Sequence, residues 1–149
     1  RLALGLDLSR EQAVLIRHSG LLHDIGKVAV PSRLLDKPAS LTDEEFDIIK
    51  KHPRLTIEIL QTVSSLSPLA AIAGGHHEHF DGSGYPQGLK GEDIPIEARV
   101  LAVADAYDAL TSDRAYRQAL SPIKAVEILE KETGSHFDPA GVAAAPLLI

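Results

Sequence analysis

The stretch His76-His77-Glu78-His79-Phe80-Asp81-Gly82-Ser83-Gly84-Tyr85-Pro86 places three histidines and two carboxylates directly before a sharp turn rich in glycine and proline. Side chains of these types suit the solvated end of a helix, because His, Asp and Gly are all favourable there. The same nitrogen and oxygen atoms also suit a metal site whose ligands lie at a helix end. The residues on either side of this stretch decide between the two interpretations.

Signals for the start of a helix recur along the whole chain. Ser9–Gln12 and Thr42–Glu45 are capping boxes, in which side chains satisfy the free N–H groups of a first helical turn. The first helix is predicted to stop at Gly26. The second is predicted to reach His52, where Pro53 forces a boundary and starts another helix. Further helices are predicted at residues 69–79, 95–110, 122–133 and from 139. No segment alternates clearly between apolar and polar residues, so the predicted fold class is all-α, with one domain.

The composition excludes several classes of protein. The chain has 149 residues, the length of one domain, and a formal net charge of −6, which argues against a general nucleic-acid binder, so no DNA partner is expected. It contains no cysteine, which rules out disulfides, thiolate metal ligands and a thiol nucleophile. The lack of cysteine is compatible with the cytoplasm, which is the expected location. No apolar run reaches membrane-spanning length, so no membrane insertion is expected.

The candidate metal ligands lie at the ends of predicted helices or inside one, and they are His23, Asp24, His52, His76, His77 and Asp105. Asp105 is the most informative of them, because it lies in a predicted helix beside Leu101, Val103 and Ala104. A carboxylate in such surroundings is costly to bury unless it is paired or bound to a metal.

The chemistry of this set indicates a centre with two ions. Imidazole and carboxylate ligands without sulfur suit Fe, Mn, Zn, Ni or Co. Four histidines and two aspartates are too many for one tetrahedral zinc ion. They fit a binuclear centre, in which ions about 3.5–4 Å apart clamp a phosphoryl group.

Each signal also has a plain structural interpretation when it is taken alone. His52 suits a helix cap, His23-Asp24 suits a pair at a helix end, and Asp81 suits the start of a turn. His18 and His79 are assigned to the solvent-exposed surface. Taken together, the paired side chains and the carboxylate inside the long helix favour a metal site.

The motifs resemble those of the HD-GYP family, a branch of the HD phosphohydrolase superfamily, from about Leu4 to Val142. The main matching segments are His23–Lys27, Lys51–Pro53, His76–Glu78, Asp81–Pro86, Val103–Asp105, Tyr116-Arg117 and Phe137–Pro139. The pair His-Asp alone is a weak signal. The pattern HHExxDGxGYP at this distance behind HDIGK is highly specific.

This resemblance implies a bacterial signalling hydrolase, a metal-dependent phosphodiesterase that converts cyclic di-GMP to pGpG and, in some members, to GMP. The six candidate ligands would hold two divalent ions, Fe or Mn first, with Zn, Ni and Co as alternatives. Asp24 would bridge the ions, and Lys27 would lie beside the scissile phosphate, so both are catalytic candidates.

The resemblance also implies how the substrate is held. The turn through Gly82 and Gly84, both expected at positive φ, would swing Tyr85 over the site. Asp108, Arg114 and Arg117 would contact guanine and phosphate, for which the planar guanidinium is well suited. Glu78 and Asp81 would orient the metal ligands without binding the metal themselves.

One departure from the family concerns a further histidine ligand on an upstream helix, which no residue of Arg1–Ser9 supplies. The chain is therefore expected to be a domain shortened at its N-terminus, and the ion near His23 and Asp105 to be held by fewer ligands. A fused sensor or receiver domain is expected in the parent protein. Two alternatives stay open: another HD-type nucleotide phosphohydrolase, and a non-catalytic module that binds cyclic di-GMP or a protein.

Overall fold

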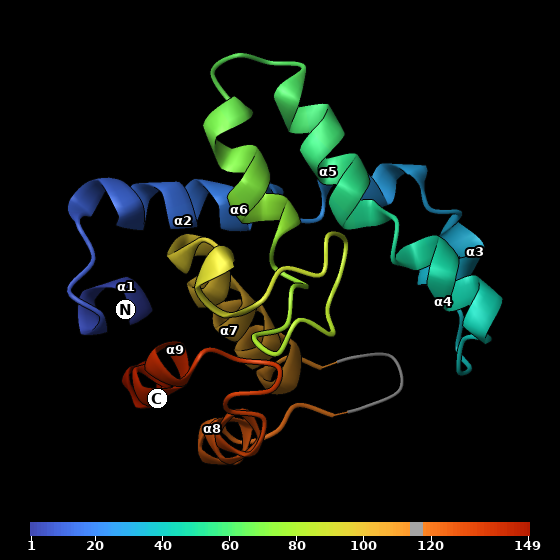
Figure 1. Cartoon of the computed structure of the whole chain (residues 1–149). Coiled ribbons are helices and arrows are strands. Elements are labelled where there is room, and N and C mark those ends of the chain that lie inside the picture. The colour runs from blue at the N-terminus through green and yellow to red at the C-terminus, as the bar shows by residue number, and fades with distance from the viewer. Residues whose placement is uncertain (114–117) are drawn as a thin grey trace.

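The computed structural model describes residues 1–113 and 118–149, and within those ranges the fold is helical, without a β-strand (Figure 1). The predicted all-α class is confirmed. The α-helices are α1 (Leu2–Gly5), α2 (Arg10–Leu22), α3 (Ser32–Leu35), α4 (Asp43–Ile49), α5 (His52–Gln61), α6 (Ala70–Gly74), α7 (Ile96–Thr111), α8 (Pro122–Lys131) and α9 (Pro139–Ala143). The 3-10 helices are η1 (Ile25–Ala29), η2 (Ser67–Leu69), η3 (Gly91–Asp93) and η4 (Ala145–Leu148). No described helix is both long enough and apolar enough to cross a membrane.

Helix starts agree with the prediction where the sequence supplies a capping residue. The Ser9 hydroxyl accepts a hydrogen bond from the Gln12 N–H (3.2 Å), and the Gln12 side chain accepts one from the Ser9 N–H (3.0 Å). Thr42 and Glu45 form the same reciprocal pair at the start of α4. Side chains that precede a proline also cap α8 and α9. These local contacts set the first residues of the helices.

Three helix boundaries differ from the prediction, and each difference involves a histidine. α2 ends at Leu22, so His23 follows the helix instead of lying in its last turn. His52 begins α5 instead of ending α4, and α6 ends at Gly74, ahead of His76. In each case the imidazole is hydrogen-bonded to the carbonyl three residues earlier, which a further turn of helix would otherwise use.

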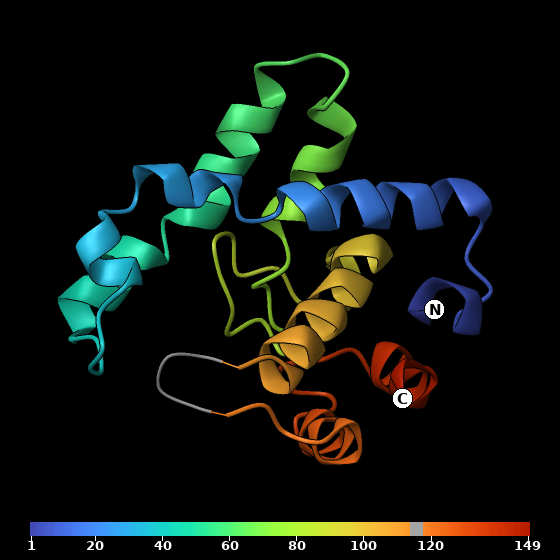
Figure 2. The same ribbon diagram turned by 180° about the vertical axis from the view of Figure 1, so that it is seen from behind.

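Helix α2 lies between two groups of helices (Figures 1 and 2). On one side α5 and α6 form a hairpin, in which the buried Leu60 and Ala73 pack with the partly buried Leu15 and Leu22 of α2. On the other side α7 packs with α8, α9 and α1, and its Val103 is fully buried. The end of α2, the start of α5, the end of α6 and the middle of α7 meet between the two groups, and the candidate ligands lie at this junction.

Candidate metal centre

Three of the candidate histidines share one local geometry just after the end of a helix. In each, Nδ1 lies close to the carbonyl oxygen three residues earlier, at 2.7 Å for His23, 2.7 Å for His52 and 2.6 Å for His76. A carbonyl can only accept, so Nδ1 carries a proton and Nε2 of the neutral ring keeps its lone pair. Terminal carbonyls of a helix lack a partner within the helix, and here they fix the tautomer and the ring orientation that a metal ligand needs.

The free nitrogens of His52 and His76 are buried at the centre of the junction. The two residues are 1% and 3% exposed, and neither Nε2 has a hydrogen-bond partner among the described residues. A buried polar atom without a partner costs roughly 1–3 kcal/mol. A cation bound to these nitrogens would remove that cost, so the two side chains fit a metal.

Burial also keeps two of the rings neutral. It lowers the pKa of His76 to about 4, helped by the neighbouring His23. It lowers the pKa of His77 to about 3, helped by His76 and His52. Neutral imidazole is the form that binds a metal ion.

Asp24 presents its two oxygens to different histidines. Oδ2 lies 3.5 Å from Nε2 of His23, and Oδ1 lies 3.2 Å from Nε2 of His52. Oδ2 also accepts a hydrogen bond from Nζ of Lys27 at 2.6 Å. Burial alone would raise the pKa of Asp24, but the hydrogen bond and the positive charge of Lys27 act against it, and the pKa lies well below its usual range. A carboxylate with its oxygens directed this way has the geometry of a bridge between two cations.

The donor atoms form two groups that overlap at His76. One group is His52, His76 and His77, and the other is His23, Asp24 and His76; within each group the ligand atoms lie within 4.8 Å of one another. Asp105 adjoins the second group, because its Oδ1 lies 3.4 Å from Nε2 of His23. The structure thus brings all six predicted ligands together from four different parts of the chain.

Asp105 is less buried than its sequence surroundings predict. Its side chain is 32% exposed, whereas Leu101 and Val103 of the same helix are buried. Burial raises the pKa of Asp105, and the His23 ring, whose Nε2 lies 3.4 Å from the carboxylate, more than reverses that effect, so the carboxyl stays ionised. Asp105 in turn is the main reason why the pKa of His23 is raised.

Thr56, which the sequence does not single out, ties two parts of the centre together. Its hydroxyl donates to the carbonyl oxygen of His23 (3.0 Å) and accepts from the N–H of Gly26 (3.0 Å). Thr56 is fully buried. Gly26 packs so tightly that a Cβ there would collide with the carbonyl oxygen of His52 and with the Thr56 backbone. The turn that carries Asp24 is therefore held directly against α5.

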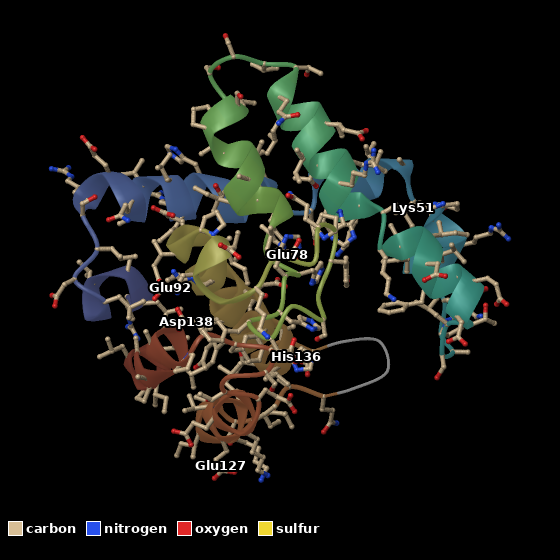
Figure 3. The ribbon with its side chains drawn as sticks, in the orientation of Figure 1. Lys51, Glu78, Glu92, Glu127, His136 and Asp138 are labelled. Atoms are coloured by element: carbon tan, nitrogen blue, oxygen red, sulfur yellow. The ribbon has the colours of Figure 1, made fainter. Side chains whose placement is uncertain are left out.

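The loop after His77 is fixed by Glu78, whose labelled side chain lies near the centre of the molecule in Figure 3. Glu78 is 3% exposed, and its carboxylate accepts hydrogen bonds from the N–H groups of Gln87 (2.7 Å) and Leu89 (2.9 Å). Asp81 accepts from the Ser83 N–H at 2.8 Å. The expectation that Glu78 and Asp81 orient metal ligands is wrong, because both carboxylates bind the backbone of this loop.

The two loop glycines serve different purposes. Gly82 has a φ of +87°, as predicted. Gly84 is not among the described residues with positive φ, and the prediction for it is wrong. It is needed for close approach, since a Cβ there would lie only 2.5 Å from the carbonyl oxygen of His77.

Tyr85 lies against the candidate ligands. Its ring stacks on that of His77, with centroids 4.9 Å apart and planes inclined by 27°, and its N–H donates to the His77 carbonyl at 3.0 Å. Burial, and then the nearby carboxylates of Asp24 and Asp105, raise the pKa of Tyr85 to about 12. The phenol therefore stays neutral and lines one side of the site.

The remaining predicted residues have different positions. Asp108 is exposed on α7, one turn beyond Asp105, while Arg114 and Arg117 lie outside the described residues. His18 is exposed as predicted. His79 is not, because its ring packs on that of His136 with centroids 4.0 Å apart.

Comparison with known proteins identifies the family of the chain. A family model described as HD domain matches residues 1–141. The chain is 45% identical over 141 residues to the cyclic di-GMP phosphodiesterase response regulator RpfG of Xanthomonas campestris pv. campestris, a match that covers 93% of this chain and 37% of that protein. It is 39% identical over 143 residues to the 3'3'-cGAMP-specific phosphodiesterase 3 of Vibrio cholerae, covering 96% of this chain and 31% of the relative. The chain therefore spans about a third of the length of these relatives.

A solved structure shows the same fold. The HDG"Y"P protein Bd1817 from Bdellovibrio bacteriovorus matches 99% of this chain and 47% of its own, with a TM-score of 0.76 at 23% identity. At that identity the likeness concerns the fold, whereas the family model and the curated relatives concern the sequence itself. The chain belongs to the metal-dependent HD domain family, in its HD-GYP branch.

Proposed function

We propose that the chain hydrolyses cyclic di-GMP to pGpG, GMP or both, with two divalent cations bound between α2, α5, α6 and α7. The observation that carries this proposal is Asp24, whose two oxygens face the Nε2 atoms of two different histidines. The relatives that are named phosphodiesterases of cyclic dinucleotides support the same reaction class.

The ligands divide between the two cations as the donor groups suggest. Asp24, His52, His76 and His77 would hold one ion, and His23, Asp24 and Asp105 the other, with the Nε2 of His76 within reach of both groups. Oxygen and nitrogen donors of this kind suit Fe or Mn, with Zn, Ni and Co as alternatives. When bound, the two ions supply Lewis-acid chemistry, which lowers the pKa of a water molecule and neutralises charge on the phosphate.

The protein's own groups orient the substrate around these ions. The Lys27 ammonium lies 2.6 Å from Asp24, where it would bind a non-bridging oxygen of the scissile phosphate and stabilise the charge that develops there. Tyr85 would pack beside the sugar-phosphate ring of the substrate. Asp108, Arg114 and Arg117 are proposed to contact guanine and the second phosphate.

A second substrate is favoured by the relative that is named a 3'3'-cGAMP-specific phosphodiesterase. Cyclic GMP-AMP has the same sugar-phosphate ring as cyclic di-GMP and differs in one base. The same metal centre would cleave either compound, so only contacts to the bases would separate them.

Regulation is proposed to come from the rest of a longer protein. The relatives compared are about three times as long as the chain, and one is named a response regulator. We propose that a sensor or receiver domain controls this domain in the cytoplasm, and that cyclic dinucleotide, not DNA, is its ligand.

The test is product analysis by chromatography after incubation with Mn²⁺ or anaerobic Fe²⁺. Cyclic di-GMP, 3'3'-cGAMP and guanosine tetraphosphate are supplied separately, with and without EDTA. The expected result is conversion of cyclic di-GMP to pGpG or GMP that EDTA abolishes and that Asp24→Asn lacks. Faster cleavage of 3'3'-cGAMP would establish the second substrate. Binding of cyclic di-GMP without any cleavage would show a non-catalytic module instead.

A further inference from the structure

A cavity of about 540 Å³ is lined by residues of η1, α3 and α4 and by the segment that joins α3 to α4. Helices α3 and α4 form one end of the molecule (Figures 1 and 2). Its walls come from η1, α3, the segment at residues 37–41 and α4, and they include Leu34, Leu41 and Ile49. Pockets for small molecules have volumes of about 300–1,000 Å³ and mostly apolar walls. The size and the lining of this cavity therefore suit a flat organic group.

Lys27 connects this cavity to the metal centre. Its side chain lines the cavity, and its ammonium lies 2.6 Å from Oδ2 of Asp24. A phosphate held at Lys27 would thus have the metal centre on one side and the cavity on the other. A nucleotide bound through this phosphate would place its own base in the cavity.

The charge of the lining suits an anionic ligand. Lys27 and Lys37 are its charged side chains, and no carboxylate belongs to the lining among the described residues. Lys37 pairs with Glu45, which lies outside the lining. An anion that enters would thus meet two ammonium groups, each of which is paired with a carboxylate outside the lining, Asp24 for Lys27 and Glu45 for Lys37.

The same lining offers little to distinguish one purine from another. Apart from the two lysines, its described side chains are aliphatic, with the single hydroxyl of Ser40. Recognition of a base edge in proteins uses side chains such as Arg, Lys, Asn, Gln, Asp or Glu. The two lysines of this lining are each already paired with a carboxylate, Lys27 with Asp24 and Lys37 with Glu45. Aliphatic walls bind a ring by its apolar area and discriminate weakly between purines.

We propose that this cavity is a nucleobase subsite, which holds one purine of the cyclic dinucleotide without reading its identity through side chains. The inference rests on the proposed function, since it places the scissile phosphate at Lys27. Selection between cyclic di-GMP and 3'3'-cGAMP then occurs at the other base, outside this cavity.

Nucleotide binding to the whole chain tests the subsite without catalysis. NMR titrations with GMP, AMP and ribose 5-phosphate, in EDTA, follow the backbone amides of residues 34–41 and Ile49. GMP and AMP should shift these amides with dissociation constants within tenfold of each other, whereas ribose 5-phosphate should leave them unchanged. Equal shifts by ribose 5-phosphate, or a preference above tenfold for one purine, would overturn the proposal.

A matched pair of variants separates filling of the cavity from general effects. Ala39 is an exposed residue of the lining, and Ala143 is an exposed residue of α9, far from the cavity. Ala39→Phe should weaken GMP binding at least tenfold, and Ala143→Phe should leave it unchanged. Unchanged GMP binding in a folded Ala39→Phe protein would contradict the subsite.

Kinetics and metal content together distinguish this inference from the proposed function. Ala39→Phe should raise KM for cyclic di-GMP at least tenfold and leave kcat and the metal content unchanged. A loss of metal, or a fall in kcat with no change in KM, would place Ala39 in the general machinery and reject the subsite. If the unmodified chain does not cleave cyclic di-GMP but GMP and AMP still shift residues 34–41, the proposed function fails while the purine site stands.

Discussion

Nε2 of His52 lies 3.2 Å from Oδ1 of Asp24, and neither atom has a hydrogen-bond partner among the described residues. The Nδ1 proton of His52 is engaged by the carbonyl of Ile49, so a neutral ring turns a lone pair toward a carboxylate. Two acceptors at this distance repel each other unless a proton or a cation lies between them. A bound cation satisfies both at once, which is why this pair is the strongest single indication of a metal site.

Asp24→Asn should therefore weaken binding of divalent metal at least about 100-fold. Mutation of a residue that only hydrogen-bonds to a metal ligand typically weakens metal binding about 10–100-fold, so the loss at Asp24 should be larger. The amide keeps the shape of the side chain but loses the charge and one acceptor that the two histidines face. Metal content after dialysis, measured by mass spectrometry, checks this, with Asp108→Asn on the exposed face of α7 as the control. Retention of both ions by Asp24→Asn would reject the bridging role.

Asp105→Ala should reduce metal content, whereas Asp108→Ala should mainly raise KM for the substrate. The two residues are one turn apart on α7, but only Asp105 contacts His23, at 3.4 Å. We expect Asp105→Ala to weaken one ion about 100-fold and Asp108→Ala to change metal affinity by less than about threefold. Calorimetric titration of the two variants with metal measures their affinities. Equal losses of metal affinity would contradict this division of roles.

Thr56→Val should weaken metal binding about 10–100-fold although Thr56 touches no metal. The valine keeps the volume but removes the hydroxyl that joins the His23 carbonyl to the Gly26 N–H. Stability should also fall by about 1–3 kcal/mol, because two buried backbone groups lose their partner.

The control for Thr56 is Thr56→Ser, which retains the hydroxyl and should restore metal affinity at a small cost in stability. Metal titrations and urea unfolding of both variants give the two readouts. If Thr56→Val loses stability but binds metal as the unmodified chain does, Thr56 has a structural role alone.

The sequence predicted those structural features that depend on contacts between residues close together in the chain. The capping boxes at Ser9–Gln12 and Thr42–Glu45 involve contacts within four positions, and both are present. Residue type and position at helix ends single out the six candidate ligands, and the family resemblance assigns them to one centre, since spacing alone does not place His23 beside Asp105. Thr56 could not be predicted, because its partners lie 30 and 33 residues away and nothing local marks it.

Errors in the prediction share a physical origin. The family resemblance implied that Glu78 orients the metal ligands, but its carboxylate accepts hydrogen bonds from the N–H groups of residues 87 and 89. Those groups become its neighbours only once the loop has folded back. Gly84 reads as a turn residue, whereas its role is to let the backbone of the loop approach His77.

Acid should destabilise the metal-free chain between pH 6.5 and about pH 4. Burial lowers the pKa of His76 to about 4 and of His77 to about 3 from the usual 6.5, so the unfolded chain binds more protons in this window. Stability then rises with pH, by up to about 1.4 kcal/mol per pH unit for each histidine. His23, whose pKa is raised by Asp105, acts above this window, because the stability it contributes is lost only as pH rises from 6.5 through its raised pKa.

Urea unfolding in EDTA at several pH values measures how steeply the free energy of unfolding changes with pH. His77→Gln should make this dependence less steep. A stability that is flat between pH 6.5 and 4.5, or that increases on acidification, would show that these rings are not buried in the neutral form. Bound metal should steepen the loss further, because protons compete with it for the same nitrogens.

The most direct test of the account is turnover of cyclic di-GMP while the metal-free chain is titrated with Mn²⁺. Two ions that share Asp24 predict no cleavage without metal, little at one equivalent, and a rise to a plateau as the second equivalent binds. Full activity at one equivalent would contradict the binuclear centre. Cleavage in the metal-free chain, or none at any metal concentration, would contradict the proposal that this domain is a metal-dependent cyclic-dinucleotide phosphodiesterase.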